Sequence, residues 1–159
     1  MQNLEPLTIK PTPPIPLWLM WAFILLSLAG LGDASYLTAK HYLGVPVACS
    51  VFEGCDKVLT SQYAVWWGVP VALLGVAYYL TLLILAAGFV FTGRVALFRF
   101  AAMLTAAGFA ASLWFIYLQL FVINAVCLYC LISAAASTLL FILGIYALKI
   151  TNNKDAYGK

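Results

Sequence analysis

The chain has 159 residues, of which 65% are hydrophobic and only 8% are charged, and its mean hydropathy is +1.04. A soluble domain of this length has too little interior to bury that much apolar surface, so the composition predicts a polytopic membrane protein. The formal net charge is only +3, and no basic patch accompanies the many aromatic residues. Binding to nucleic acid therefore has no support.

The N-terminal stretch 1–16 is polar and rich in proline, and we expect an extended tail there. An apolar run begins at Leu17, and its helical pattern continues past Gly32 to about Tyr42. A signal peptide is the alternative to a membrane span, but it would follow a more basic segment. Because residues 17–42 supply the roughly 20 residues that a span needs, we predict a first transmembrane helix.

The connection 44–67 is the only sizeable hydrophilic segment between apolar runs, and it contains Cys49 and Cys55. It ends with the Trp66-Trp67 pair, and paired tryptophans beside an apolar run mark a membrane interface. We expect a short interfacial helix before this pair, with its apolar side lying flat on the lipid. That side would consist of Val58, Leu59 and Tyr63.

Three further apolar runs, 69–91, 95–121 and 127–148, are each long enough to cross a bilayer. The second of these is rich in alanine, which lets a neighbouring helix pack closely. A polar tail, 150–159, ends the chain. The predicted fold is an all-α membrane protein. Its domain, 17–149, is a four-transmembrane-helix bundle with a cysteine-bearing external loop between the first two helices.

The basic residues predict the orientation in the membrane. Six of the eight lie in the two tails and in the link between the second and third spans. Since cytoplasmic segments carry an excess of lysine and arginine, both termini should be cytoplasmic. All the cysteines then lie on the external or periplasmic side of the cell membrane, where disulfides form. The six are Lys10, Arg94, Arg99, Lys149, Lys154 and Lys159; the other two are Lys40 and Lys57.

Cys127 and Cys130 form a Cys-x-x-Cys pair at the start of the fourth span. At the first turn of a helix, free backbone N–H groups and the macrodipole stabilise a thiolate. The loop pair, Cys49 and Cys55, can exchange with it, because disulfide exchange carries electrons without a metal. The cysteines therefore predict an electron relay. The final acceptor has to take electrons from a thiolate at membrane depth, and a quinone is a lipid-soluble molecule that can do so.

Other chemistries use the same residues. The cysteines could form an all-cysteine zinc site, or inert structural disulfides in a non-catalytic membrane scaffold. Zinc is disfavoured because Cys49 and Cys55 are spaced more widely than a zinc knuckle. Haem is disfavoured because His41 is the only histidine. Asp33, the one acid near the membrane interior, is a functional candidate that either accepts protons or orients the loop, or else lies at the interface.

The order of these motifs resembles the vitamin K epoxide reductase family, and more narrowly its bacterial and archaeal members. The DsbB family, another group of four-span disulfide generators, carries its Cys-x-x-Cys in the first external loop instead. The residues that carry the resemblance are Cys49, the run 55–61, Gly68-Val69-Pro70 and Cys127-Leu128-Tyr129-Cys130.

The resemblance implies a thiol:quinone oxidoreductase that supports disulfide formation, with a quinone of the ubiquinone, menaquinone or vitamin K type as acceptor. Cys130 would face the quinone, with Cys127 as its disulfide partner. Cys55 would exchange with Cys127, and Cys49 would meet a thioredoxin-like or DsbA-like protein on the external side. Ser61 matches a family serine that lies near the active site and helps to hold the loop.

The chain departs from the vertebrate members of the family at two positions. Those members carry an asparagine before the second span and a tyrosine one turn after the Cys-x-x-Cys, and both bond the vitamin K head group. Ala64 and Ala134 stand at these positions here, which favours a respiratory quinone over an epoxide. Some bacterial relatives also carry a fused thioredoxin-like domain. The segment 150–159 is too short for one, so we expect a separate soluble partner besides the membrane lipid.

Overall fold

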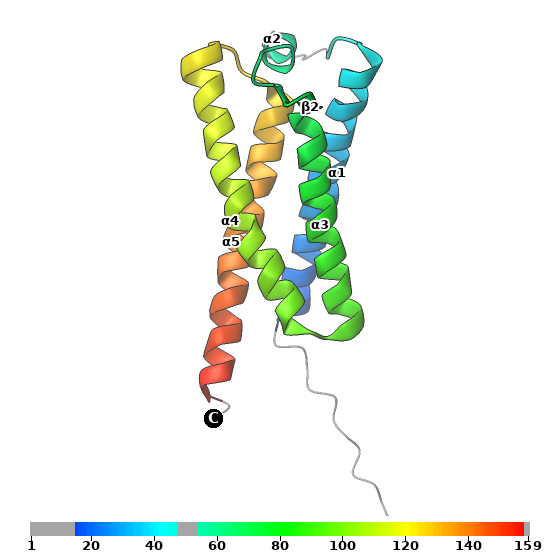
Figure 1. Cartoon of the computed structure of the whole chain (residues 1–159). Helices are drawn as coiled ribbons and strands as arrows, with labels where there is room; N and C mark the ends of the chain where they lie inside the picture. Colours follow the sequence, from blue (N-terminus) through cyan, green and yellow to red (C-terminus); the bar gives the residue numbers. More distant parts are fainter. Residues whose placement is uncertain (1–14, 48–53, 158–159) are drawn as a thin grey trace, which may run out of the picture.

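The computed structural model describes residues 15–47 and 54–157. Most of the predicted tail 1–16, and Cys49 with it, lies outside the described residues. The described residues form four long helices and a short one, with a small hairpin beside the short helix (Figure 1). In order, the elements are α1 (Leu17–Leu43), α2 (Cys55–Leu59), β1 (Val65–Trp66), β2 (Val69–Pro70), α3 (Val71–Thr92), α4 (Val95–Tyr117), a π-helical turn η1 (Leu118–Ile123) and α5 (Leu128–Tyr157).

The predicted four-helix membrane bundle is confirmed. Four helices are long and apolar enough to cross a bilayer, so the chain is a multi-pass membrane protein. Their limits are Leu17–Leu43, Val71–Thr92, Val95–Ile123 and Leu128–Asn153. The last helix, α5, continues to Tyr157, about two and a half turns beyond the predicted end of the fourth span at 148.

The main hydrophobic core lies at the end of the bundle where α3 and α4 are linked. Its centre is Phe98, whose ring centroid lies 5.1 Å from that of Phe23 and 5.4 Å from that of Phe89. From this end α4 packs along α5, whereas α3 packs along α1. Figure 1 shows α3 and α4 diverging from their link toward the other end of the bundle. That other end is covered by α2 and the hairpin.

The short helix α2 differs from the prediction in the face that it buries. A helix is present in the loop, but Cys55 and Val58 are buried in a small cluster at the end of the bundle. Val58 therefore packs onto the protein, with Leu59 partly buried against the same cluster, whereas Tyr63, which the prediction placed on the same side, is 37% exposed. The exposed aromatic surface comes from the hairpin instead, where Trp66 and Trp67 are 70% and 99% exposed.

Candidate functional site

Cys127 forms the N-terminal cap of α5. The left-handed residue Asn124 (φ 51°) ends η1, and α5 begins at Leu128. The backbone N–H of Cys130 donates to Cys127 Sγ at 3.4 Å, and the N–H of Leu131 donates to the Cys127 carbonyl at 3.1 Å. The sulfur thus takes the place that a serine or aspartate oxygen usually has at a helix start.

This position favours the Cys127 thiolate. The Cys130 thiol, hydrogen-bonded to the Cys127 sulfur, lowers the pKa of Cys127 to about 7, and the backbone N–H groups of Tyr129 and Cys130 add to the effect. Burial acts in the opposite direction, since the Cys127 side chain is fully buried. The hydrogen bond from the Cys130 thiol is the largest of these effects, and the backbone N–H groups of the helix start make smaller contributions that add to it; together they outweigh the burial.

Gln119 supports the same turn and is a residue that the sequence analysis missed. Its side-chain Oε1 accepts a hydrogen bond of 2.8 Å from the backbone N–H of Cys127, and its backbone carbonyl accepts one of 3.1 Å from Ala125. Gln119 is buried within η1, and π-helical turns often occur at functional sites. The available signal was a lone amide in an apolar run, eight residues before the Cys-x-x-Cys.

The structure brings Cys55 next to Cys127. Both are buried in one cluster with Leu37, Val47 and Val58. Cys55 is disulfide-bonded, whereas Cys127 and Cys130 carry free thiols. Since a sulfur in a disulfide is no thiolate ligand, Cys55 does not fit a zinc site in this state.

Gly54 allows α2 to lie close to the Cys-x-x-Cys segment. A Cβ added to Gly54 would lie 2.7 Å from both the backbone N and the backbone O of Val126. No other residue type fits without moving one of the two segments. Gly54 directly precedes Cys55, and Val126 directly precedes Cys127, so this backbone contact sets the two cysteines side by side.

A cavity of about 820 Å³ lies under α2, between the long helices. The residues that the sequence analysis singled out for quinone binding all line it, and so does the acidic candidate. Neither Cys55 nor Cys127 lines it, so of the described cysteines Cys130 alone faces the cavity. The lining includes Asp33, Ser61, Ala64, Cys130 and Ala134.

Ser61 and Ala64 hold the segment between α2 and α3. The hydroxyl of Ser61 donates to the carbonyl of Val58 at 2.7 Å, and the N–H of Ala64 donates to the Ser61 carbonyl at 3.0 Å. The N–H of Val71, the first residue of α3, donates to the Ala64 carbonyl at 2.9 Å. These bonds fix the loop over the cavity.

Asp33 lies on α1 and lines the cavity. Its Oδ2 is buried and has no hydrogen-bond partner among the described residues.

Tyr79 of α3 joins α3 to α5. Its hydroxyl donates to the backbone carbonyl of Ser133 at 2.8 Å and lies 3.0 Å from the Ser133 hydroxyl. Gly30 leaves room for the Tyr79 ring, because a Cβ there would overlap it.

The small residues of α4 serve two purposes. Ala101 and Ala102 are buried, and a Cβ on Gly144 of α5 would lie 3.3 Å from Ala102 Cα, which is the close helix packing that the sequence predicts. Nearer the loop end, Ala107 and Ala111 line the cavity instead. There the small side chains leave space open between helices.

The fold and this site define a multi-pass membrane bundle with a Cys-x-x-Cys dithiol placed between a cysteine-bearing loop and a cavity among the long helices. The sequence profile of the Vitamin K epoxide reductase family matches residues 21–145. The chain belongs to this family.

A curated relative in Arabidopsis thaliana is Thiol-disulfide oxidoreductase LTO1. It is 33% identical over 138 residues, which cover 79% of this chain and 36% of the relative. The chain therefore spans about a third of the length of that relative.

Proposed function

We propose that the protein is a thiol:quinone oxidoreductase, which takes electrons from a thioredoxin-like protein and passes them to a membrane quinone. The observation that carries the proposal is the position of the Cys-x-x-Cys pair. Cys127 is buried in one cluster with Cys55 of the loop, and Cys130 faces a cavity between the membrane-spanning helices. Membership of the family and the name of the plant relative support thiol–disulfide chemistry.

Electrons enter through the loop. The dithiol of the partner reduces the disulfide between Cys49 and Cys55, and the partner leaves oxidised. The Cys55 thiolate then attacks the Cys127 sulfur of an oxidised Cys127–Cys130 pair, so that the Cys55–Cys127 bond forms and Cys130 leaves as a thiolate. Cys49 next attacks Cys55, re-forms the loop disulfide and releases Cys127. A bonded Cys55 and free Cys127 and Cys130 are the products of this step.

The lowered pKa of Cys127 favours this direction. A thiol with a lower pKa is a better leaving group in disulfide exchange. The pKa of Cys127 is about 7, so the attack of Cys49 on Cys55 expels Cys127 readily. The interactions that stabilise the Cys127 thiolate, of which the hydrogen bond from the Cys130 thiol is the largest, therefore speed its release from the mixed disulfide.

Electrons leave through Cys130. Oxidation of Cys127 and Cys130 to a disulfide releases two electrons and two protons, the number that reduction of a quinone to a hydroquinone consumes. A pKa near 7 leaves Cys127 deprotonated in about half of the molecules at neutral pH, and in those molecules one of the two protons has to come from another group. Asp33 lines the same cavity and is placed to hold it.

The cavity fits a quinone as the acceptor. It holds about 820 Å³, its lining is mostly apolar, and a few polar atoms point into it, as is usual for small-molecule sites. Ala64 and Ala134 line it without offering a polar side chain. This lining agrees with a respiratory quinone as the substrate.

The test is reduction of a soluble naphthoquinone by the purified chain, driven by a reduced thioredoxin-like protein. Cys130→Ser should abolish the reaction, whereas Tyr146→Phe, on the exposed side of α5, should not change it. A full rate in Cys130→Ser would remove this thiol from the mechanism. If the chain is a scaffold instead, its cysteines will stay in one redox state when quinone or reduced partner is added.

The proposed orientation places both termini in the cytoplasm and the loop on the external side, because six of the eight basic residues lie on one side. Alkaline phosphatase fused after Lys159 should then be inactive, and a fusion near Gly54 should be active. The reverse pattern would overturn the orientation.

A further inference from the structure

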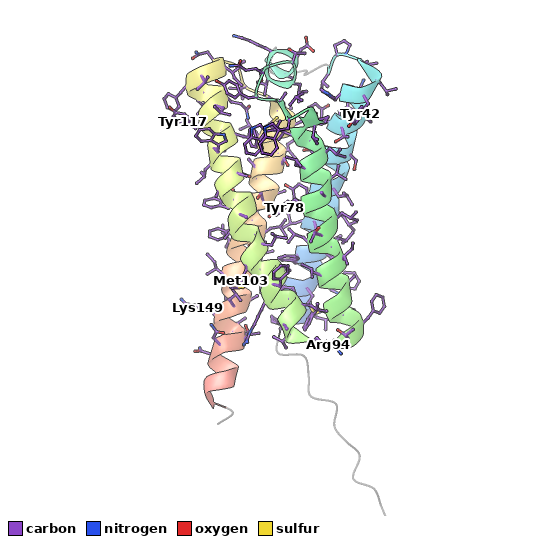
Figure 2. The ribbon with its side chains drawn as sticks, in the orientation of Figure 1. Tyr42, Tyr78, Arg94, Met103, Tyr117 and Lys149 are labelled. Carbon is purple, nitrogen blue, oxygen red and sulfur yellow. The ribbon has the colours of Figure 1, made fainter. Side chains whose placement is uncertain are left out.

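Two buried hydroxyl groups of the cavity wall have no role in the mechanism above. Tyr78 of α3 and Ser137 of α5 both line the cavity, and neither hydroxyl oxygen has a hydrogen-bond partner among the described residues. The two lie next to each other, but not in the geometry of a hydrogen bond. Figure 2 shows Tyr78 in the interior of the bundle.

Most buried hydroxyls in this bundle are satisfied locally. Ser27 donates to the carbonyl of Phe23 at 2.8 Å, and Thr151 donates to the carbonyl of Ala147 at 2.8 Å, each four residues back along its helix. Ser137 could make the same bond within α5 but does not. A buried polar group without a partner is costly, so its usual explanation is a ligand or ordered water that supplies the bond.

The positions of the two residues are well defined. The ring of Tyr78 occupies the space above Gly108 of α4, where any added Cβ would overlap the phenol. Ser137 follows Cys130 by seven residues, so the two lie on the same face of α5, about 10 Å apart along its axis. The hydroxyls therefore lie deeper in the cavity than the Cys130 thiol.

We propose that Tyr78 and Ser137 together donate hydrogen bonds to one carbonyl oxygen of the quinone ring, whose other edge faces Cys130. This inference rests on the quinone-linked function proposed above. A carbonyl oxygen has two lone pairs and can accept from two neighbouring hydroxyls. Ala64 and Ala134 have no polar side chain with which to bind the quinone. In this proposal Tyr78 of α3 and Ser137, deeper in α5, make the polar contacts with the quinone instead. The ring and its tail lie against an apolar wall that includes Leu74, Ala107, Ala111 and Phe115.

The test compares two ligands that share one carbon skeleton and differ in the carbonyl groups, 2,3-dimethyl-1,4-naphthoquinone and 2,3-dimethylnaphthalene, by titration calorimetry on the full chain in detergent, with Cys127 and Cys130 oxidised to a disulfide so that neither thiol reacts with the quinone. Tyr78→Phe and Ser137→Ala each remove one hydroxyl and little else. Each should weaken binding of the quinone about 3- to 10-fold, the usual range for one hydrogen bond, and leave binding of the hydrocarbon unchanged. Tyr146→Phe is the control, because that hydroxyl is on the exposed side of α5.

The opposite result would be an unchanged quinone Kd in both variants with a lower melting temperature in Tyr78→Phe. It would mean that the hydroxyls bind each other and join α3 to α5. If Tyr78→Phe does not fold, Ser137→Ala decides alone. Failure of this inference is distinct from failure of the proposed function. A chain that binds the quinone through these hydroxyls but does not reduce it would overturn the function and keep the binding site.

Discussion

The backbone N–H of Cys127 donates a 2.8 Å hydrogen bond to the side-chain Oε1 of Gln119. This bond joins the π-helical end of α4 to the first turn of α5, and both groups are buried. It holds the amide of a cysteine whose sulfur caps the same turn. The position of the Cys127 thiol therefore depends on a residue of another helix.

Removing that acceptor should destabilise the site. Gln119→Leu would leave the buried N–H of Cys127 without a partner, at a cost of about 1–3 kcal/mol. We expect the melting temperature to fall by several degrees and the thiolate absorbance of Cys127 at 240 nm to move to higher pH. Leu120→Ala, on the exposed side of η1, is the control and should leave the thiolate unchanged. An unaltered thiolate titration in Gln119→Leu would show that the bond does not position the sulfur.

Gly54→Ala should slow electron transfer from the loop to the Cys-x-x-Cys pair. The added Cβ would be 2.7 Å from the backbone of Val126, so α2 has to move away and Cys55 has to separate from Cys127. In stopped-flow measurements we expect reoxidation of the loop dithiol by the oxidised Cys127–Cys130 pair to slow at least about 10-fold, which corresponds to a barrier about 1.4 kcal/mol higher. Quinone reduction driven by a small dithiol that reduces Cys127–Cys130 directly should be unaffected.

The matched control for that variant is Gly32→Ala, because a Cβ at Gly32 of α1 has no atom within 4 Å. It should leave the exchange rate unchanged and slightly favour the helix. Equal rates in Gly54→Ala and Gly32→Ala would mean that the contact between Gly54 and Val126 does not control the exchange.

The thiolate of Cys127 should form with a midpoint near pH 7, against an ordinary value of 9.0. Since the folded state favours the thiolate, this group stabilises the dithiol form fully above pH 9, and the contribution is lost as the pH falls through 7. Cys130→Ala removes the thiol that makes the largest contribution to the lowered pKa. The midpoint of the absorbance at 240 nm should then shift upward. A midpoint that stays near 7 would assign the effect to the helix start alone.

The order of the loop cysteines can be tested by trapping. Disulfide exchange with a partner passes through a mixed disulfide, and we expect Cys49 to form it because Cys49 is farther along the chain from the membrane-entry tryptophans than Cys55. Cys55→Ala should therefore accumulate a reducible adduct with a thioredoxin-like protein through Cys49. An adduct that forms through Cys55 in Cys49→Ala, and none through Cys49, would reverse the order.

Some features of this protein are determined by local sequence. The four spans follow from the length and hydropathy of each apolar run, because a helix in a bilayer must satisfy its own backbone and needs only apolar side chains to be stable there. The Cys-x-x-Cys spacing likewise defines a dithiol at a helix start without knowledge of the rest of the chain. Both depend on residues that are close together in sequence.

Tertiary structure decides the remainder of the site. Three features of the site come from the way that different elements pack together. They are the approach of Gly54 to Val126, the hydrogen bond from the Cys127 N–H to Gln119, and the neighbouring hydroxyls of Tyr78 and Ser137. The apolar pattern around Val58 predicts an amphipathic helix but cannot say whether lipid or protein covers it. A hydropathy pattern predicts which side chains are buried away from water, whereas only the packed bundle determines which other residues they contact.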